Sequence, residues 1–177
     1  MKQKIFDEND YNSNDGMLTN IWGPSMWHTL HTISFNYPID PSQEEKKKYL
    51  NFFRSVGDVL PCKYCRINFK KNLKSCPLNM STMKNRLTLS RWLYNLHEDI
   101  NTMLGKTSNL SYDDVRNRYE MFRARCLNKK TLKRKTKKER GCIKPLYGVR
   151  SKCVLNIVPK NKRCKTFKID KRCNLRR

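Results

Sequence analysis

The sequence has 177 residues, 37% of them hydrophobic, and it carries 39 lysines and arginines against 15 acidic residues, a formal net charge of +24. This length accommodates one domain and a tail. No apolar run reaches the roughly 20 residues that a membrane-spanning helix needs, which excludes a transmembrane class. The first 20 residues are polar and partly acidic, unlike a signal or transit peptide. We therefore expect a cytoplasmic protein with no membrane span.

The positive charge is concentrated toward the C-terminus. Residues 129–177 contain 20 lysines and arginines against Glu139 and Asp170 alone, so they hold 18 of the 24 net charges. Asn, Asp, Ser and Gly dominate the first 20 residues, a composition typical of disorder. We predict three parts: a disordered N-terminal segment over 1–20, a folded domain over 21–127, and a basic cysteine-containing tail over 128–177.

Apolar residues in the predicted domain recur with the period of helices, and no strand pattern competes before Cys126. Pro24 opens a first helix that Pro38 ends, because proline is tolerated at the start of a helix but not inside it. Further helices are predicted from Pro41 to Leu60, through Cys62 to about Cys76, from Ser81 to Leu104, and from Ser111 to Phe122. The predicted fold class is all-α, a four-helix bundle plus a short fifth helix.

The most informative motif is the run Leu60-Pro61-Cys62-Lys63-Tyr64-Cys65-Arg66. Two cysteines separated by two residues can close a small disulfide when they lie in the first turn of a helix. The positive end of the helix macrodipole and the two neighbouring cations favour the thiolate form. The motif therefore predicts a disulfide that exchanges readily with other thiols.

Other interpretations of this motif stay open on the sequence alone. A CxxC is half of a zinc site, for which Cys76 and His97 are candidate further ligands, although neither has ligand-pair spacing. A purely structural pair is another possibility. A thioredoxin motif is disfavoured, because the residues before Pro61 predict a helix where thioredoxin has a strand.

Two further clusters flank this motif on neighbouring predicted helices. Trp27 and His31 are four residues apart, as are His97 and Asn101, so each pair shares one helix face. Tryptophans are often core residues, and a lone histidine is more often buried and hydrogen-bonded than a ligand. Faces that mix aromatic and polar groups beside a reactive dithiol can also hold a planar aromatic cofactor and hydrogen-bond its edges.

Four blocks in this order resemble the Erv/ALR family of FAD-linked sulfhydryl oxidases, most of all its short viral members. They are WGPxxWxxLH at 22–31, YP at 37–38, PCxxC at 61–65 and WLxxLHxxINxxLGK at 92–106. The resemblance covers about Trp22 to Phe122. It implies a helical bundle that holds FAD, a short fifth helix, and a homodimer.

The resemblance also implies site residues. Cys65 matches the cysteine nearest the flavin, and Cys62 matches the one that meets the incoming thiol. No metal ligand is implied. The cofactor-binding positions that it carries over are Gly23, Trp27, His31, Tyr37, His97, Asn101, Leu104, Lys106, Tyr112 and Tyr119. This chain departs from the family pattern at Glu98, where asparagine is usual, and at Tyr94, where cellular members have a bracing cysteine.

The function that the resemblance implies is an FAD-dependent thiol oxidase that forms disulfides in protein substrates. Electrons would pass from a dithiol through Cys62–Cys65 to FAD and then to O2, giving H2O2. A viral late protein of the host cytoplasm or the virion is expected. The rival is a zinc-stabilised, basic nucleic-acid-binding protein.

The tail has no second CxxC to serve as a shuttle, but it contains four cysteines, Cys142, Cys153, Cys164 and Cys173. A solvated basic tail with incidental thiols is the simplest interpretation. Binding of nucleic acid or another polyanion through charge, or electron transfer from tail thiols to Cys62, are the alternatives.

Overall fold

The computed structural model describes residues 7–125, 142–159, 161–162 and 170, which belong to two compact units, 1–109 and 110–177. The first unit contains the helices α1 (Glu8–Asn12), α2 (Thr19–Phe35), α3 (Gln43–Val59), α4 (Lys63–Ser75) and α5 (Arg86–Met103). The second unit contains α6 (Tyr112–Glu120) and the strands β1 (Ala124–Arg125) and β2 (Lys144–Pro145). No described helix is long and apolar enough to cross a membrane.

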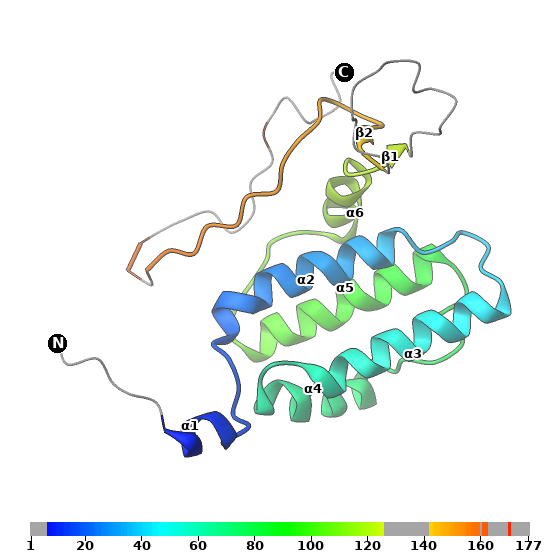
Figure 1. Ribbon diagram of the computed structural model, residues 1–177. Helices are drawn as coiled ribbons and strands as arrows, with labels where there is room; N and C mark the ends of the chain where they lie inside the picture. The colour runs from blue at the N-terminus through cyan, green and yellow to red at the C-terminus, as the bar shows by residue number, and fades with distance from the viewer. Residues whose placement is uncertain (1–6, 126–141, 160, 163–169, 171–177) are drawn as a thin grey trace, which may run out of the picture. The chain divides into compact units, whose positions relative to one another are not determined.

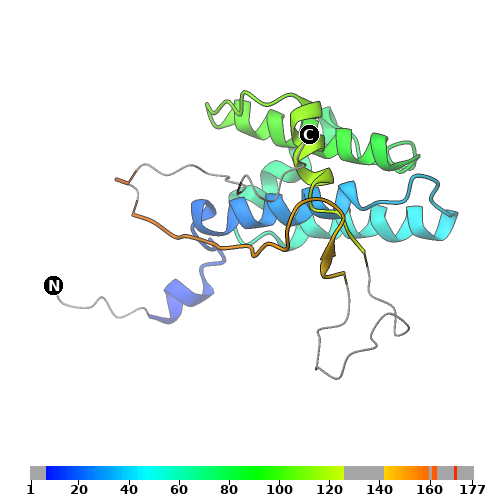
Figure 2. The ribbon, with the colours of Figure 1, turned by 90° about the horizontal axis from the view of Figure 1, so that it is seen from above.

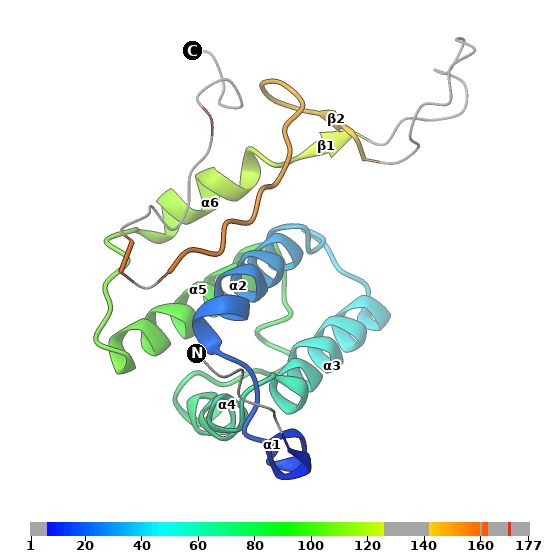
Figure 3. The same cartoon turned by 60° about the vertical axis from the view of Figure 1, so that its left-hand side comes forward.

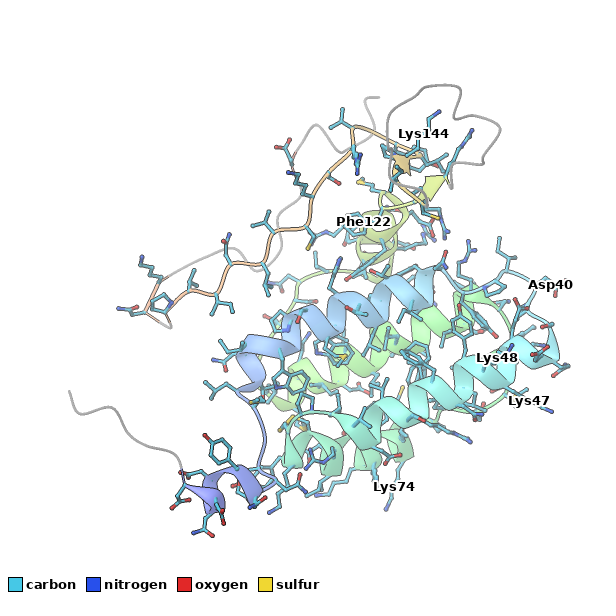
Figure 4. All side chains as sticks on the ribbon, in the orientation of Figure 1. Asp40, Lys47, Lys48, Lys74, Phe122 and Lys144 are labelled. Carbon is cyan, nitrogen blue, oxygen red and sulfur yellow. A yellow bond between two sulfur atoms is a disulfide. The ribbon has the colours of Figure 1, made fainter. Side chains whose placement is uncertain are left out.

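The four long helices of the first unit form the predicted bundle. Helices α2 and α5 lie side by side, and α3 packs on α4 (Figures 1 and 2). Burial of apolar surface, at about 25 cal/mol per Å², is the main source of its stability. The core of the bundle consists of Leu30, Tyr37, Leu50, Phe53, Val56, Leu60, Phe69, Leu78, Met83, Leu89, Trp92, Leu93 and Leu96. Charged side chains such as Lys47, Lys48 and Lys74 extend away from the helices (Figure 4).

Gly57 makes the close approach of α3 and α4 possible. A Cβ atom at this position would lie 2.1 Å from Cδ1 of Phe69, a buried side chain of α4. Because there is no room for a methyl group, glycine lets the Phe69 ring lie against the α3 backbone. This contact holds α4, the helix that begins within the CxxC motif, against α3.

Capping side chains fix where most of these helices begin. Ser42 and Glu45 form a capping box at the start of α3, and Asn85 and Thr88 do the same for α5. The predicted start of the fourth helix at Ser81 was therefore wrong. The Asn79 side chain instead accepts hydrogen bonds from the backbone N–H groups of Ser81 and Thr82, which makes a turn there.

The N-terminal prediction also needs correction. Residues 7–20 were expected to be disordered, but Asp7 and Asp10 form a capping box that starts α1. Helix α2 begins at Thr19, so Pro24 lies inside it rather than at its first position. Figure 3 shows the chain passing from α1 by the start of α4 to the start of α2. Residues 1–6 lie outside the described part of the chain.

The second unit begins with α6, which starts at the predicted capping box of Ser111 and Asp114. The antiparallel strands β1 and β2 follow Phe122 and carry Lys144 (Figure 4), although no strand was predicted before Cys126. Each strand has two residues, too few for a period-2 pattern to show in the sequence. Cys142 is disulfide-bonded, and Cys153 is a free, exposed thiol.

Candidate active site

The two cysteines of the CxxC motif form a disulfide at the N-terminus of α4, with their Cα atoms 5.1 Å apart. Cys62 is the N-cap residue, and its Sγ accepts a hydrogen bond from the Cys65 backbone N–H at 3.2 Å. Cys65 is partly buried and packs against the core of the bundle. The N-cap position places Cys62 at the positive end of the helix dipole, where a thiolate is stabilised.

The two cations next to the cysteines have partners of their own. Arg66 donates to the backbone oxygen of Leu60 at 2.6 Å and to the side-chain oxygen of Asn14 at 2.8 Å. Lys63 lies 3.7 Å from the Asp15 carboxylate, and both side chains are more than half exposed. The sequence predicted that these cations would stabilise thiolates. The structure shows that they also attach the N-terminal segment to the site.

A cluster of Trp27, His31 and His97 joins α2 to α5. The rings of Trp27 and His97 are stacked, with centroids 3.9 Å apart and an interplanar angle of 8°. His31 Nε2 lies 3.1 Å from His97 Nδ1, so one imidazole donates a hydrogen bond to the other. Sequence reasoning placed these residues on two helix faces, and the fold brings the faces together.

Both histidines of this cluster are held neutral. Burial, and then the nearby imidazoles of His97 and His28, lower the pKa of His31 to about 3. Burial lowers the pKa of His97 to about 4, although Glu98 opposes the shift and Lys106 adds to it. Neutral imidazoles offer one donor and one acceptor each, which suits hydrogen bonding to the edge of an uncharged ring system.

The C-terminal end of α5 adds three more predicted residues to this region. Asn101 donates from its side-chain amide to Glu98 at 3.0 Å, and Glu98 also accepts from the Ser108 hydroxyl at 3.0 Å. The Lys106 N–H bonds the backbone oxygen of Asn101 at 2.8 Å. Leu104 caps the helix and is about half exposed. Glu98, flagged only as a departure from the family pattern, therefore fixes the Asn101 side chain.

The remaining predicted cofactor-binding residues are on other parts of the structure. Tyr37 is fully buried, and its hydroxyl donates to the backbone oxygen of Met83 at 2.9 Å, so in this structure it packs the bundle. Burial raises its pKa to about 12. Gly23 is buried in α2. Tyr112 and Tyr119 lie on α6, in the second unit.

Sequence reasoning missed the contribution of residues 14–19, which lie against the CxxC motif. A possible signal was Asn14-Asp15-Gly16, a run of residues that favour turns. Within the described residues, no three side chains of His, Cys, Asp or Glu come together as a metal site would require. The zinc reading of the CxxC therefore gains no support from this part of the chain.

A family model described as Erv1 / Alr matches residues 24–120, more than half of the chain. The chain belongs to the Erv1/Alr family. The match covers the CxxC motif, the Trp27–His31–His97 cluster and α6, which confirms the resemblance drawn from the four sequence blocks.

Relatives in the Erv1/Alr family come from viruses and from cellular organisms. A probable FAD-linked sulfhydryl oxidase of Acanthamoeba polyphaga mimivirus is 38% identical over 85 residues, which are 48% of this chain and 59% of that protein. A putative FAD-linked sulfhydryl oxidase of Invertebrate iridescent virus 6 is 30% identical over 49% of this chain and 81% of its own length. The mitochondrial FAD-linked sulfhydryl oxidase of Saccharomyces cerevisiae is 29% identical over 48% of this chain and 43% of its own length. The alignments thus span only about half of several relatives.

The FAD-binding domain of Erv1 from Saccharomyces cerevisiae has a similar structure, with a TM-score of 0.53 and 24% identity. The comparison covers 58% of this chain and 94% of that domain. At this identity the likeness shows the fold alone. It confirms the prediction of a helical bundle.

Proposed function

We propose that this chain is an FAD-linked sulfhydryl oxidase that forms disulfide bonds in thiol-containing proteins. The observation that carries the proposal is the Cys62–Cys65 disulfide at the N-terminus of α4, in a chain of the Erv1/Alr family. A disulfide at a helix N-terminus is a good electron acceptor for thiols, because the dipole stabilises the thiolate of its reduced form.

The residues around the bundle suit a bound flavin. Trp27 and His97 offer aromatic faces against which a planar ring can stack, and the neutral His31–His97 pair offers hydrogen-bonding edges. Lys106 supplies a cation at the end of α5 that would suit a phosphate. The resemblance to the family pattern adds further proposed cofactor-binding positions: Gly23, Tyr37, Asn101 and Leu104, and Tyr112 and Tyr119 on α6. When bound, FAD would accept two electrons from the protein dithiol and transfer them to O2, giving H2O2.

The chemistry assigned to this chain is thiol–disulfide exchange. A substrate thiolate attacks Cys62 Sγ, and the Cys62–Cys65 bond breaks, so that its electron pair remains on Cys65 Sγ. A second substrate thiolate then attacks the mixed disulfide and releases Cys62, which leaves an oxidised substrate and a reduced CxxC. Cys62 is assigned to the substrate because it is the capping residue, whereas Cys65 packs toward the core.

The finer features stay part of this proposal: O2 as the final acceptor, a homodimer, and a late-expressed protein of the host cytoplasm or virion. The viral relatives support a viral setting. Mass measurement of the purified protein in solution tests the dimer. A monomeric mass at micromolar concentration would contradict it.

The test of the function is the absorption spectrum of the purified full-length protein, followed by oxygen consumption with dithiothreitol. We expect a flavin band in the blue and steady oxygen uptake. Cys65→Ser should retain the yellow colour and lose the oxygen uptake, whereas Cys153→Ser, which removes a free exposed thiol, should retain both. A colourless protein, or uptake that survives Cys65→Ser, would contradict the proposal.

A further inference from the structure

Residues Asn14 to Thr19, here called the strap, lie against the backbone of the CxxC motif. The Met17 N–H donates to the backbone oxygen of Pro61 at 2.7 Å, and the Lys63 N–H donates to the backbone oxygen of Asp15 at 2.9 Å. These bonds pair Gly16 with Cys62 as in an antiparallel bridge. The strap is therefore attached directly to the reactive disulfide by its backbone.

Gly16 lets the strap approach this closely. Its φ is +106°, in the region that favours glycine, and a Cβ atom would lie 2.5 Å from the Pro61 oxygen and 2.8 Å from Cys62 Cα. Any other residue would have to move the strap away from the motif. The contact is thus specified by one glycine and by two backbone hydrogen bonds.

Arg66 holds the beginning of the strap. Its Nη2 donates to the backbone oxygen of Asn14 at 3.0 Å and to the Asn14 side-chain oxygen at 2.8 Å, while Nη1 bonds Leu60. The Arg66 guanidinium therefore links the beginning of the strap to Leu60, the residue that follows α3. The strap ends at Thr19, which is also the first residue of α2.

The strap brings the Thr19 hydroxyl to the sulfur that carries charge during exchange. Thr19 Oγ1 lies 4.0 Å from Cys65 Sγ, the outer limit for a hydrogen bond to sulfur. We propose that Thr19 is a catalytic residue, whose hydroxyl donates to Cys65 Sγ when that sulfur leaves as a thiolate. This proposal rests on the thiol–disulfide exchange assigned to Cys62 and Cys65 above.

The electrons balance without a further reactant. As the incoming thiolate bonds to Cys62 Sγ, the electron pair of the Cys62–Cys65 bond stays on Cys65 Sγ, and no proton is consumed. A hydrogen bond to a charged sulfur is stronger than one to a neutral disulfide. The hydroxyl therefore stabilises the leaving group more than the oxidised state, which lowers the pKa of the leaving thiol and speeds exchange.

The test compares Thr19→Val, which keeps the shape and removes the hydroxyl, with Thr19→Ser, which keeps the hydroxyl. The full-length protein is equilibrated in the absence of oxygen with mixtures of reduced and oxidised dithiothreitol, quenched with acid and alkylated. Mass spectrometry then gives the fraction of Cys62–Cys65 that is oxidised. We expect Thr19→Val to need about three- to tenfold more reduced dithiothreitol for half reduction, because a bond to a charged group is lost. Thr19→Ser should stay within about twofold of the parent.

A second measurement reads the thiolate directly. In a Cys62→Ser background, the pH dependence of Cys65 alkylation by iodoacetamide should move to higher pH on Thr19→Val but not on Thr19→Ser. Thr19→Ala removes the hydroxyl with a smaller side chain and should behave like Thr19→Val, which covers the case that valine perturbs folding. Circular dichroism confirms that each variant retains its helices.

Two results would overturn the proposal: unchanged reduction and alkylation profiles in Thr19→Val and Thr19→Ala, or equal shifts in Thr19→Ser, which would indicate a structural role. Neither measurement uses flavin or oxygen. A parent protein that consumes no oxygen with dithiothreitol would contradict the oxidase function, while the Thr19 comparison would still decide this proposal.

Discussion

His31 Nε2 on α2 lies 3.1 Å from His97 Nδ1 on α5, so a hydrogen bond between two neutral imidazoles joins the paired helices. Trp27 stacks on His97 from the same side of α2. The same residues thus hold two helices together and form the proposed flavin site. Changes here are expected to alter stability and cofactor binding together.

His97→Ala tests this double role. It removes the stacking partner of Trp27 and the hydrogen bond to His31, so we expect flavin affinity to fall about tenfold or more and the melting temperature to drop, since a ligand that binds only the folded state stabilises it. Flavin content and thermal unfolding are measured on the same samples. Thr29→Ala, at an exposed position of α2, is the control. Unchanged flavin content in His97→Ala would remove His97 from the site.

The two histidines also predict how stability depends on pH. Their pKa values in the folded state, about 3 and about 4, lie below the ordinary 6.5, so the unfolded chain binds protons that the folded chain excludes. Above about pH 6.5 both histidines are neutral in the folded and in the unfolded state, so they do not make the free energy of unfolding depend on pH. As pH falls below 6.5, the free energy of unfolding should drop by up to about 2.7 kcal/mol per pH unit.

Urea unfolding of the flavin-free protein between pH 7.5 and 5 measures this slope. Replacing either histidine by leucine should reduce the slope by about half, because one of the two protons is no longer taken up on unfolding. A slope that is the same in the parent and in both single variants would show that other groups dominate.

Glu98 should position Asn101. Glu98→Ala removes the acceptor for both the Asn101 amide and the Ser108 hydroxyl, and we expect it to cost about 1–3 kcal/mol of stability and to weaken flavin binding. Glu98→Gln retains one good acceptor, so its stability and flavin affinity should lie between those of the parent and of Glu98→Ala. Asp99→Ala, an exposed neighbour, is the control. Equal loss in Glu98→Ala and Asp99→Ala would indicate a general charge effect.

Gly57→Ala should destabilise the bundle by about 1–3 kcal/mol, as overpacking of a dense core does. The added methyl group would meet the Phe69 ring and force α3 and α4 apart. Chemical denaturation measures the loss. Ser55→Ala, on an exposed position of the same helix, is the control and should change stability little. A stable Gly57→Ala protein would show that Phe69 moves aside at low cost.

The basic tail is expected to bind polyanions and not to be required for the oxidation of small thiols. A chain that ends at Leu127 should fold, bind flavin and oxidise dithiothreitol, because α2–α6 all precede that point. The full chain should bind a polyanion such as heparin, with an affinity that falls steeply with added salt. Heparin retention that does not differ between the two chains would contradict this role.

Changing Cys142, Cys153, Cys164 and Cys173 to serine together tests the electron-relay alternative, because the charge of the tail is then untouched. If oxidation of a protein substrate drops while oxidation of dithiothreitol persists, the tail carries electrons. If neither changes, the relay reading fails.

The sequence predicted the bundle well because its signals were local. The Ser111–Asp114 capping box and the position of Cys62 ahead of α4 depend on residues within a few positions of one another. The helix start predicted at Ser81 overlooked two local signals: the Asn79 side chain, which accepts from N–H groups two and three residues on, and the Asn85–Thr88 capping box that starts α5. Tyr37 matched a family block, yet its hydroxyl bonds Met83, a contact across 46 positions that no local pattern reveals.

The strap was missed for the same reason. A polar, glycine-containing segment predicts disorder when it is considered alone, and its partners at Pro61 and Lys63 lie far along the chain. Glu98 was noticed only because it departs from a family pattern. Its hydrogen bond to Asn101 could have been expected from their spacing of three residues on one helix.

The attachment of the strap also has a consequence for hydrogen exchange. Pairing Gly16 with Cys62 closes a loop that contains α2 and α3, and contacts that hold it, such as Thr19–Cys65 and Lys63–Asp15, are exposed. Such a segment can open by local unfolding while the bundle stays intact. The amide hydrogens of Met17 and Lys63 should therefore exchange with deuterium far sooner than those inside α5. Their exchange rates give the free energy of opening. Comparing the oxidised with the reduced protein shows whether reduction of the Cys62–Cys65 disulfide makes the strap open more readily.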